Sequence, residues 1–263
     1  MKFNQPENPE ILKCSIAYNE LGAYCIPDSS NHEGAGEIVS RGVVYEGCTH
    51  KFIRDNCGSG DIVHAGTFFG DMIPSFSQVC KGTVWAFEPV RENYRCAKIT
   101  MMLNGGCSNV RMTNSGLGSR EDAVLIQTGR TSGKGLGGCA RIMEVKEGCA
   151  HEMIRITTID KVVPKDQNVS IMQLDVEGFE MEALQGGIET INASKPYLVL
   201  EAVVDKKYDP DSILRNEWFI ENILSRGYKL ADFDGVMGDK GHRAKIHGNL
   251  CFTHADRPAP VYF

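Results

Sequence analysis

The segment from Ser170 to Gly187 constrains the fold of this chain more than any other. It begins with the mostly apolar run SIMQL, and two acids, Asp175 and Glu177, follow within the turn DVEG. Beyond the turn, apolar residues recur at helical spacing, at Met181, Leu184, Ile188 and Ile191. The pattern predicts a buried strand, a tight turn and one amphipathic helix. Because ligands bind beyond the carboxyl ends of strands in open parallel sheets, both acids are expected at a ligand site.

From about residue 51 onward, predicted strands alternate with predicted helices. Helices are expected at 73–80 and 91–103, and a mobile glycine-rich loop is expected between Gly129 and Gly148. The strands are expected at 61–66, 83–89, 109–119, 123–128, 170–174, 197–204, 228–233 and 249–253. This alternation predicts an α/β fold, with a parallel sheet covered by helices on both faces. The last two strands are expected to form an antiparallel hairpin, connected by residues 234–248.

Residues 1–50 are predicted to form a small N-terminal cap on a main domain of residues 51–263. Within the cap, the segments AYCIP and EIVSRGVVYE suggest short strands, and the turn-rich segment DSSNHEGAG lies between them.

Composition excludes several classes of protein. The formal net charge of −6 argues against a nucleic-acid partner, which normally meets a basic face. No apolar run reaches the roughly 18 residues of a membrane span, and the N-terminus lacks the apolar core of a signal peptide. Ten scattered cysteines include no Cys-x-x-Cys pair, so a zinc knuckle is not predicted. The cysteines are expected to be reduced thiols, which favours a cytoplasmic protein.

Glycines and an acid after the first two predicted strands favour a nucleotide site. Gly66 and Gly70 bound the turn after the first strand, but their G-x-x-x-G spacing lacks the third glycine of a dinucleotide fingerprint. Glu88 ends the next strand, 18 residues after Gly70, where an acid can accept hydrogen bonds from both ribose hydroxyls. The alternative is a solvated acid beside a turn proline. Together with the acids after the later strand, these positions favour S-adenosylmethionine over a dinucleotide.

At this point the chain resembles the FkbM family of methyltransferases. The matching motifs occur in family order over roughly residues 50–205, and LDVEGFE is the most specific of them. They are GDIVHAGTFFG (60–70), VWAFEP (84–89), LNG (103–105), NSGLGS (114–119), TTID (157–160), LDVEGFEMEALQGG (174–187) and PYLVLE (196–201). The resemblance implies a Rossmann-like class I fold, a mostly parallel seven-stranded sheet with an antiparallel closing strand. It also implies S-adenosylmethionine as cofactor and a hydroxyl of a small molecule, sugar or glycolipid as methyl acceptor.

The resemblance also implies roles for individual residues. Gly66, Thr67, Phe68 and Gly70 would form the cofactor loop, in which the family usually has Asn where this chain has Phe68. His64 stands where the family usually has an acid, so it either binds the amino-acid end of the cofactor or is a buried strand-end histidine. By analogy, the adenine would lie near Ser115 and Gly116.

The methyl-transfer end is assigned to acids after the strand 170–174. Asp175 would hold the methionine end of the cofactor or the acceptor hydroxyl. Glu177 would do the same or act as an N-terminal helix acid. His151, His242 and His247 are candidate general bases, although a lone loop histidine is more often only exposed.

Three alternatives stay open at this stage. No metal site is predicted, although the oxygen ligands of Asp175, Glu201 and Asn249 could gather a hard cation. An NAD-dependent oxidoreductase or epimerase would use Glu88 and the glycine turn in the same way, but the chain lacks an evident Tyr/Lys or Cys/His catalytic set. A non-catalytic cofactor-binding protein is the third possibility, if His64 and Phe68 have altered the loop.

Overall fold

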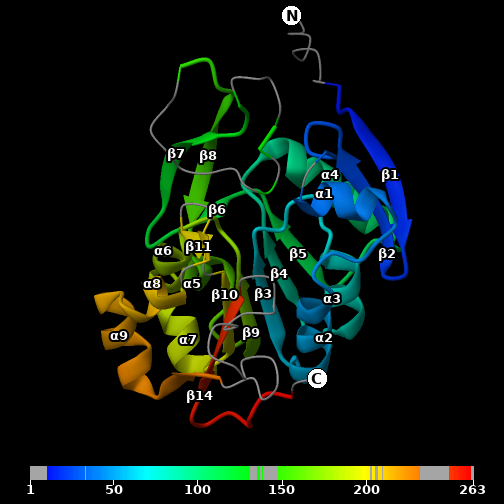
Figure 1. Ribbon diagram of the computed structural model, residues 1–263. Coiled ribbons are helices and arrows are strands. Elements are labelled where there is room, and N and C mark those ends of the chain that lie inside the picture. Colours follow the sequence, from blue (N-terminus) through cyan, green and yellow to red (C-terminus); the bar gives the residue numbers. More distant parts are fainter. Residues whose placement is uncertain are drawn as a thin grey trace, which may run out of the picture.

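A seven-stranded sheet forms the centre of the molecule (Figure 1). The computed structural model of the chain describes residues 11–32, 34–130, 135–136, 138, 147–201, 203–204, 207–208, 210–231 and 249–261. The strands of the sheet lie in the order β13 (Tyr228–Leu230), β14 (Asn249–His254), β10 (Tyr197–Glu201), β9 (Val169–Leu174), β3 (Asp61–Ala65), β4 (Val84–Phe87) and β5 (Val110–Thr113). Strands β10, β9, β3, β4 and β5 pair in parallel, whereas β14 is antiparallel to both its neighbours. The mostly parallel seven-stranded sheet is therefore confirmed.

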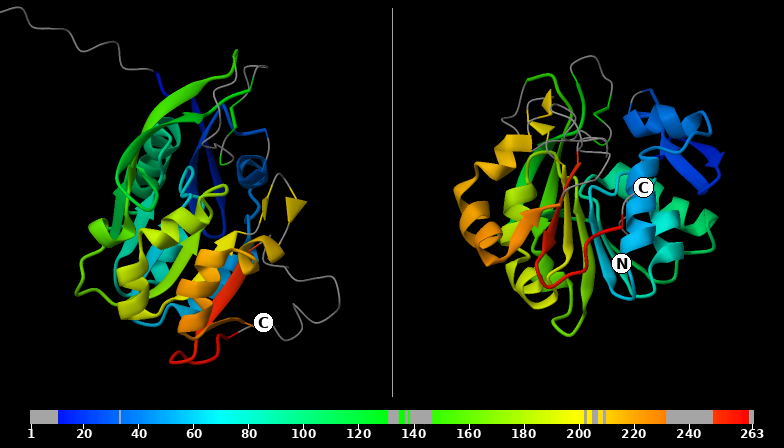
Figure 2. Two further views of the ribbon diagram at one scale, coloured as in Figure 1. Left: turned by 90° about the vertical axis from the view of Figure 1, so that its left-hand side faces the viewer. Right: turned by 60° about the horizontal axis from the view of Figure 1, so that its bottom comes forward.

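Helices cover both faces of this sheet, because its central strands are apolar on both sides. In β9, Ile171 packs against one face, while Met172 and Leu174 pack against the other. The first layer consists of α2 (Gly47–Asn56), α3 (Ile73–Val79) and α4 (Arg91–Leu103). The second layer contains α5 (Ile159–Val162), α6 (Glu180–Gln185), α7 (Ile188–Ser194) and α9 (Glu217–Asn222). The two layers are visible on opposite sides of the sheet in Figure 2.

An N-terminal hairpin, β1 (Cys14–Asn19) and β2 (Gly22–Pro27), packs beside α4. The Asn104 side chain donates to Ala23 O at 2.6 Å, and Thr100 Oγ1 accepts from Cys25 N at 3.0 Å. The predicted strand AYCIP is confirmed as part of β2. The predicted strand EIVSRGVVYE is wrong, because its first part lies in helix α1 (Gly34–Ser40). A run this short does not distinguish the two periodicities. The domain division at residue 50 stays a prediction.

A separate three-stranded sheet projects beyond the central one (Figure 1). It contains β6 (Gly116–Leu117), β7 (Asp122–Gln127) and β8 (His151–Thr157), in the order β6-β8-β7. Strand β8 ends at Thr157, since Thr158 caps α5 by accepting from Lys161 N at 3.2 Å. Most of the predicted loop 129–148 lies outside the described residues.

The last third of the chain differs from its prediction at one strand. Strand β10 ends at Glu201, short of the predicted 204, and β11 (Val203–Val204) pairs with β12 (Lys207–Tyr208) outside the central sheet. Helix α8 (Pro210–Leu214) follows. The predicted hairpin of β13 and β14 is confirmed, and the predicted connection 234–248 lies outside the described residues. No helix in the described part of the chain is both long enough and apolar enough to cross a membrane.

The segment Ser170–Gly187 folds as a strand and a turn, as predicted, but the single helix predicted after the turn is wrong. Two helices, α6 and α7, meet at Gly186 and Gly187. A Cβ at Gly186 would lie 2.0 Å from Gly118 O, so the helix junction approaches the β6 strand without room for a side chain. The low helix propensity of paired glycines accounts for the break.

The Gly186 contact predicts a large effect of a single methyl group. Gly186→Ala should lower the free energy of unfolding by about 2 kcal/mol or more, because backbone rather than a mobile side chain must move. Gly47→Ala is the control, since the nearest atom to its added Cβ is the Val44 Cγ1, at 4.0 Å. Urea unfolding followed by circular dichroism measures both. Equal stabilities of the two variants would contradict the packing described.

Candidate functional site

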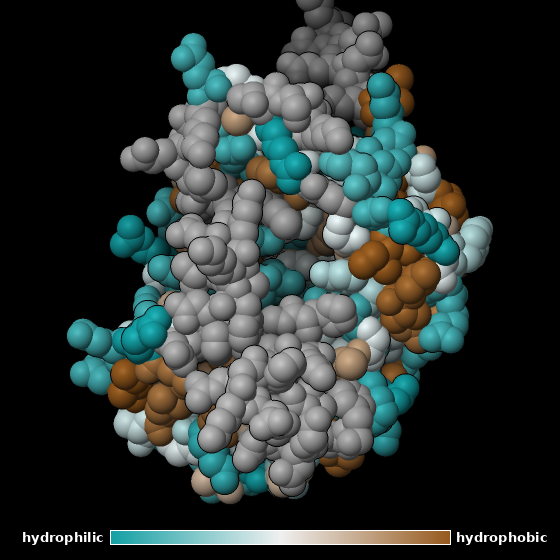
Figure 3. Space-filling model, viewed as in Figure 1, coloured by the Kyte–Doolittle hydropathy of each residue, from teal (hydrophilic) through white to brown (hydrophobic). Residues whose placement is uncertain are grey.

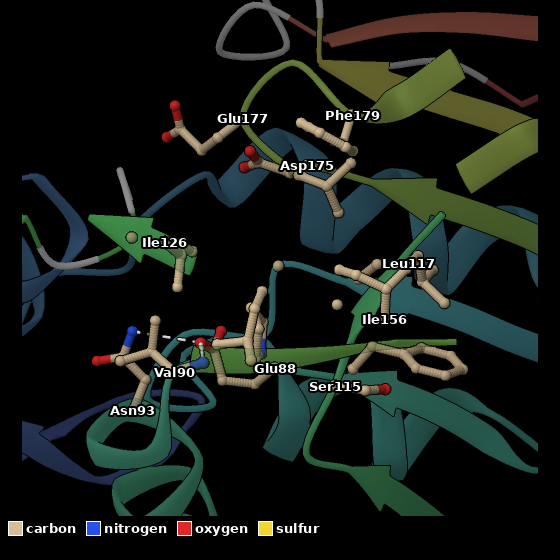
Figure 4. Close-up of a pocket in the computed structure, with 18 residues that line it drawn as sticks. Glu88, Val90, Asn93, Ser115, Leu117, Ile126, Ile156, Asp175, Glu177 and Phe179 are labelled. Atoms are coloured by element: carbon tan, nitrogen blue, oxygen red, sulfur yellow. Dashed lines mark hydrogen bonds between the residues drawn. The ribbon is translucent and has the colours of Figure 1, made fainter. Parts of the chain in front are cut away.

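A pocket of about 570 Å³ opens at the carboxyl ends of β3, β4 and β9 (Figure 4). Figure 3 shows that the surface is hollowed near the centre of the face drawn there. The polar side chains of the pocket wall are Glu88, Asn93, Ser115, Asp175 and Glu177, and its apolar wall includes Val90, Leu117, Ile126, Ile154, Ile156 and Phe179. The edge of the sheet predicted to bind a ligand therefore carries a pocket.

Gly66 lies in the pocket wall at the end of β3, where two constraints require glycine. Its φ angle is +82°, in the left-handed region. A Cβ at this position would lie 1.8 Å from Asp175 O. The β3 turn and the end of β9 therefore come into close backbone contact, and this contact joins the two predicted halves of the site.

Glu88 follows β4 at the opposite side of the pocket from Asp175 (Figure 4). The side chain is 4% exposed, and its two carboxylate oxygens accept from Phe68 N and from Val90 N, each at 2.8 Å. Asn93 also donates to it, at 3.4 Å. A carboxylate offers about four acceptor positions, so lone pairs remain for ligand hydroxyls. The alternative of a solvated acid beside Pro89 is wrong, because Glu88 is buried and bonded.

Ser115 and Gly116 line the pocket beside Glu88, as the sequence prediction requires for an adenine site. Ser115 is 3% exposed, and its Oγ has no hydrogen-bond partner among the described residues. An unsatisfied buried hydroxyl is costly, so a ligand atom is its natural partner. Ile126, Ile154 and Ile156 of the projecting sheet close this side with an apolar wall.

The loop residues Thr67, Phe68 and Gly70 do not line the described pocket. Thr67 is fully buried, and Gly70 packs against α4 with a φ of +82°. Phe68 has a φ of 52°, a strained value for an aromatic residue and one that Asn adopts more readily. Its backbone N–H nevertheless orients Glu88, and its ring packs against Phe69 at a centroid distance of 4.7 Å. The loop therefore still donates a backbone hydrogen bond to Glu88, although residue 68 is Phe rather than Asn.

His64 lies in β3, with its side chain buried against Phe76 of α3, and it does not line the described pocket. Its Nδ1 is hydrogen-bonded to Gln173, its cross-strand neighbour on β9, and its ring contacts Phe76. Burial lowers the pKa of His64 to about 4, so the imidazole is neutral at pH 7. This placement corresponds to the predicted alternative of a strand-end histidine.

Asp175 and Glu177 lie at the other end of the pocket (Figure 4). Glu201, which does not line the pocket, forms one cluster with them. One carboxylate oxygen from each of these three residues lies within 4.8 Å of the others. Burial, and then the charge of Asp175, raise the pKa of Glu201 well above its ordinary range. Burial also raises the pKa of Asp175, and the two carboxyls share a hydrogen bond. At neutral pH this pair therefore retains a proton.

Two further buried acids, Glu46 and Asp71, lie near this cluster and were not predicted from the sequence. Both are at least 90% buried, and the Asp175 charge acts on both. Glu46 accepts from Thr49 Oγ1 at 2.8 Å and from Asn249 Nδ2 at 3.3 Å. Glu46 precedes a helix in a segment with no motif, so only the αL backbone angle of +49° marks it as unusual.

The described structure does not bring His151, one of the predicted bases, to the acids. His151 begins β8 in the projecting sheet, and its Nε2 is buried without a partner in the described part of the chain. It lies outside the pocket wall. His242 and His247 lie outside the described residues. The carboxyls are therefore the titratable groups that the described structure places at the pocket.

Comparison with known proteins gives one family. A family model described as Methyltransferase FkbM domain matches residues 56–230, which is more than half of the chain. A search of curated proteins gives no significant match.

Solved structures show more distant likenesses. The methyltransferase FkbM of Methylobacillus flagellatus KT is 18% identical, with a TM-score of 0.48, and the match covers 74% of this chain and 44% of that chain. The chain thus spans less than half of that protein. TYW2 of M. jannaschii, solved in complex with AdoMet, is 14% identical over 94% of this chain and 89% of its own, with a TM-score of 0.44.

The buried acids predict an unusual dependence of stability on pH. Burial raises the pKa of Glu46 and of Glu88 to about 8, and that of Asp71 and of Glu180 to about 7. A carboxyl whose pKa is higher in the folded chain binds its proton more tightly when folded. Its stabilisation is therefore complete below an unfolded-state pKa of about 4 and is lost as the pH rises through 7–8.

The midpoint of thermal unfolding of the ligand-free chain should consequently fall by at least about 3 °C between pH 6 and pH 8.5. Differential scanning fluorimetry over this range measures the change. Glu46→Gln, which keeps an acceptor for Thr49, should flatten the curve, whereas the exposed Glu221→Gln should leave it unchanged. A midpoint that stays constant or rises over this range would contradict the burial described for these groups.

Proposed function

Because the chain belongs to the FkbM family of S-adenosylmethionine-dependent methyltransferases, we propose that it transfers a methyl group to a hydroxyl of a small molecule, sugar or glycolipid. The observation that carries this proposal is that one pocket has two chemically different ends. Glu88 and Ser115 offer polar groups beside an apolar wall at one end, and carboxylates cluster at the other. A nucleoside fits the first end, and a cationic centre fits the second.

The first end suits the adenosine half of S-adenosylmethionine. Glu88 is fixed by two backbone N–H groups and can accept from both ribose hydroxyls, which is how an acid after the second strand acts in Rossmann-like folds. Ser115 Oγ is an unsatisfied group that can bond to the adenine edge. Ile126, Ile154 and Ile156 give an apolar surface for the flat base. Gly66 lets the backbone approach the ligand closely.

The second end suits methyl transfer. When bound, S-adenosylmethionine supplies a methyl group on a positively charged sulfonium, and the C–S bond breaks as the C–O bond to the acceptor forms. The Asp175 carboxylate attracts that charge, and Asp175 or Glu177 can accept the proton that leaves the hydroxyl. Burial raises the pKa of Asp175, which makes it a better base than an exposed Asp. His151 stays a candidate base only if acceptor binding brings it to the pocket.

The character of the acceptor is inferred from charge. Carboxylates accept hydrogen bonds and suit a hydroxylated ligand, whereas they repel a phosphate backbone. We therefore propose a small-molecule or glycan acceptor and no nucleic acid, in line with the net charge of −6. A reducing, cytoplasmic setting is proposed because the nine cysteines in the described part of the chain are free thiols.

The ribose assignment predicts the effect of one isosteric change. Glu88→Gln keeps the shape and one acceptor oxygen but replaces the other oxygen with an NH₂ donor, so S-adenosylmethionine should bind about 10–100-fold more weakly. Isothermal titration calorimetry on the full chain measures this. The exposed Glu121→Gln variant serves as the control and should bind as tightly as the wild type.

The same titration tests the cofactor class. S-adenosylmethionine should release heat on binding to the wild type, whereas NAD should not. Binding of NAD alone would contradict the proposal and favour an oxidoreductase. Incubation with methyl-labelled S-adenosylmethionine and hydroxylated acceptors then tests turnover. Binding without turnover of any hydroxyl, amine or thiol acceptor would point instead to a non-catalytic binding protein.

A further inference from the structure

We propose that Asp175, Glu201 and Asn249 form a binding site for one divalent cation, Mg²⁺ or Mn²⁺, at the edge of the pocket. Its binding is independent of the proposed function, whereas its role in methyl transfer rests on that function. Carboxylate and amide oxygens are the ligands these hard cations prefer.

Strand register brings the three side chains to one place. Leu174 pairs with Leu200 in the parallel ladder of β9 and β10, so the next residues, Asp175 and Glu201, stand side by side where the strands end. Glu201 pairs in turn with Asn249 in the antiparallel ladder of β10 and β14. Residues directly opposite in such a pair project to the same face of the sheet. The site is thus fixed by three adjacent strands rather than by loops.

The amide of Asn249 gives evidence of a ligand that is independent of the acids. Asn249 is 2% exposed, and its Nδ2 donates to Glu46, so the side chain is directed toward the acids. Its Oδ1 has no hydrogen-bond partner within the described ranges. A buried carbonyl oxygen left unsatisfied costs roughly 1–3 kcal/mol. A cation bound beside it would use that lone pair.

Backbone strain at the same place supports a functional cluster. Glu46, which is hydrogen-bonded to Asn249, and Glu177, which clusters with Asp175 and Glu201, both have left-handed backbone angles, with φ of +49° and +56°. Such angles are uncommon for non-glycine residues, and they concentrate at ligand sites, where the surroundings hold them. Two strained acids directed at one cluster are difficult to explain by packing alone.

The position separates this site from the cofactor pocket. Asp175 lies in the pocket wall, whereas Glu201 and Asn249 lie beyond it. A positively charged group of the cofactor can face Asp175 from inside the pocket, whereas Glu201 and Asn249 are not among the residues that line it. A cation there could bind an acceptor hydroxyl, make its proton easier to remove and hold its oxygen in place. The hydroxyl proton would pass to Glu177 or to water.

Metal titration of the full chain tests this proposal directly. After chelator treatment, the wild type should bind one equivalent of Mn²⁺, and Mg²⁺ more weakly, with a dissociation constant below about 1 mM in calorimetry. Glu201→Gln and Asn249→Ala should each weaken Mn²⁺ binding by about 10-fold or more, while the exposed Glu221→Gln should not change it. Circular dichroism establishes that the variants fold. If Asn249→Ala does not fold, the isosteric Glu201→Gln variant still tests the site.

The readouts distinguish this proposal from the function it extends. Asn249→Ala should keep the wild-type affinity for S-adenosylmethionine, because Asn249 neither lines the cofactor pocket nor belongs to the carboxylate cluster. Mn²⁺ binding that is lost in Glu201→Gln supports the site even if no methyl transfer is found. The cation site is overturned if the wild type shows no measurable binding of Mn²⁺ or Mg²⁺, or if both variants bind Mn²⁺ as tightly as the wild type. Either result overturns the site even if methyl transfer occurs.

Discussion

The contact between the β3 turn and the end of β9 is the constraint on which the site depends. Gly66 meets the Asp175 backbone so closely that a Cβ would lie 1.8 Å from its carbonyl oxygen. Two residues later, the Phe68 N–H fixes Glu88 at the end of β4. A single glycine therefore sets the spacing between Glu88 and the acids at the other end of the pocket. Because the sheet is rigid, this spacing does not depend on the variable loops.

The second organising property is the concentration of acids at one end of the pocket. Burial keeps the pKa values of Glu46, Asp71, Glu201 and Asp175 above their ordinary ranges, and neighbouring acids add to the effect. The ligand-free chain can hold such a cluster only by retaining protons or by binding a positive charge. The proposed attraction of a sulfonium, acceptance of a hydroxyl proton and binding of a cation all draw on this same cluster.

Sequence reasoning identified the parts of the site that local pattern determines. The strand before Asp175 is an unbroken apolar run, and the positions of Gly66 and Glu88 follow from strand ends, so these predictions needed no tertiary information. His64 was ambiguous because a strand residue faces one side or the other by register, and the pairing with Gln173 decides it. Glu46 and Ile126 come from separate elements with no motif, and only the folded chain brings Glu46 near the acid cluster and Ile126 to the pocket wall. The helix break at Gly186 depends on a contact with Gly118, which no local pattern contains.

The central claim is that one pocket binds S-adenosylmethionine with its ribose at Glu88 and its sulfur toward Asp175. A crystal structure of the full chain with S-adenosylhomocysteine tests this most directly. The account predicts both ribose hydroxyls within hydrogen-bonding distance of the Glu88 carboxylate, the adenine between Ser115 and Ile156, and the sulfur on the Asp175 side. A ligand bound elsewhere, or bound in this pocket with the ribose away from Glu88, would contradict it.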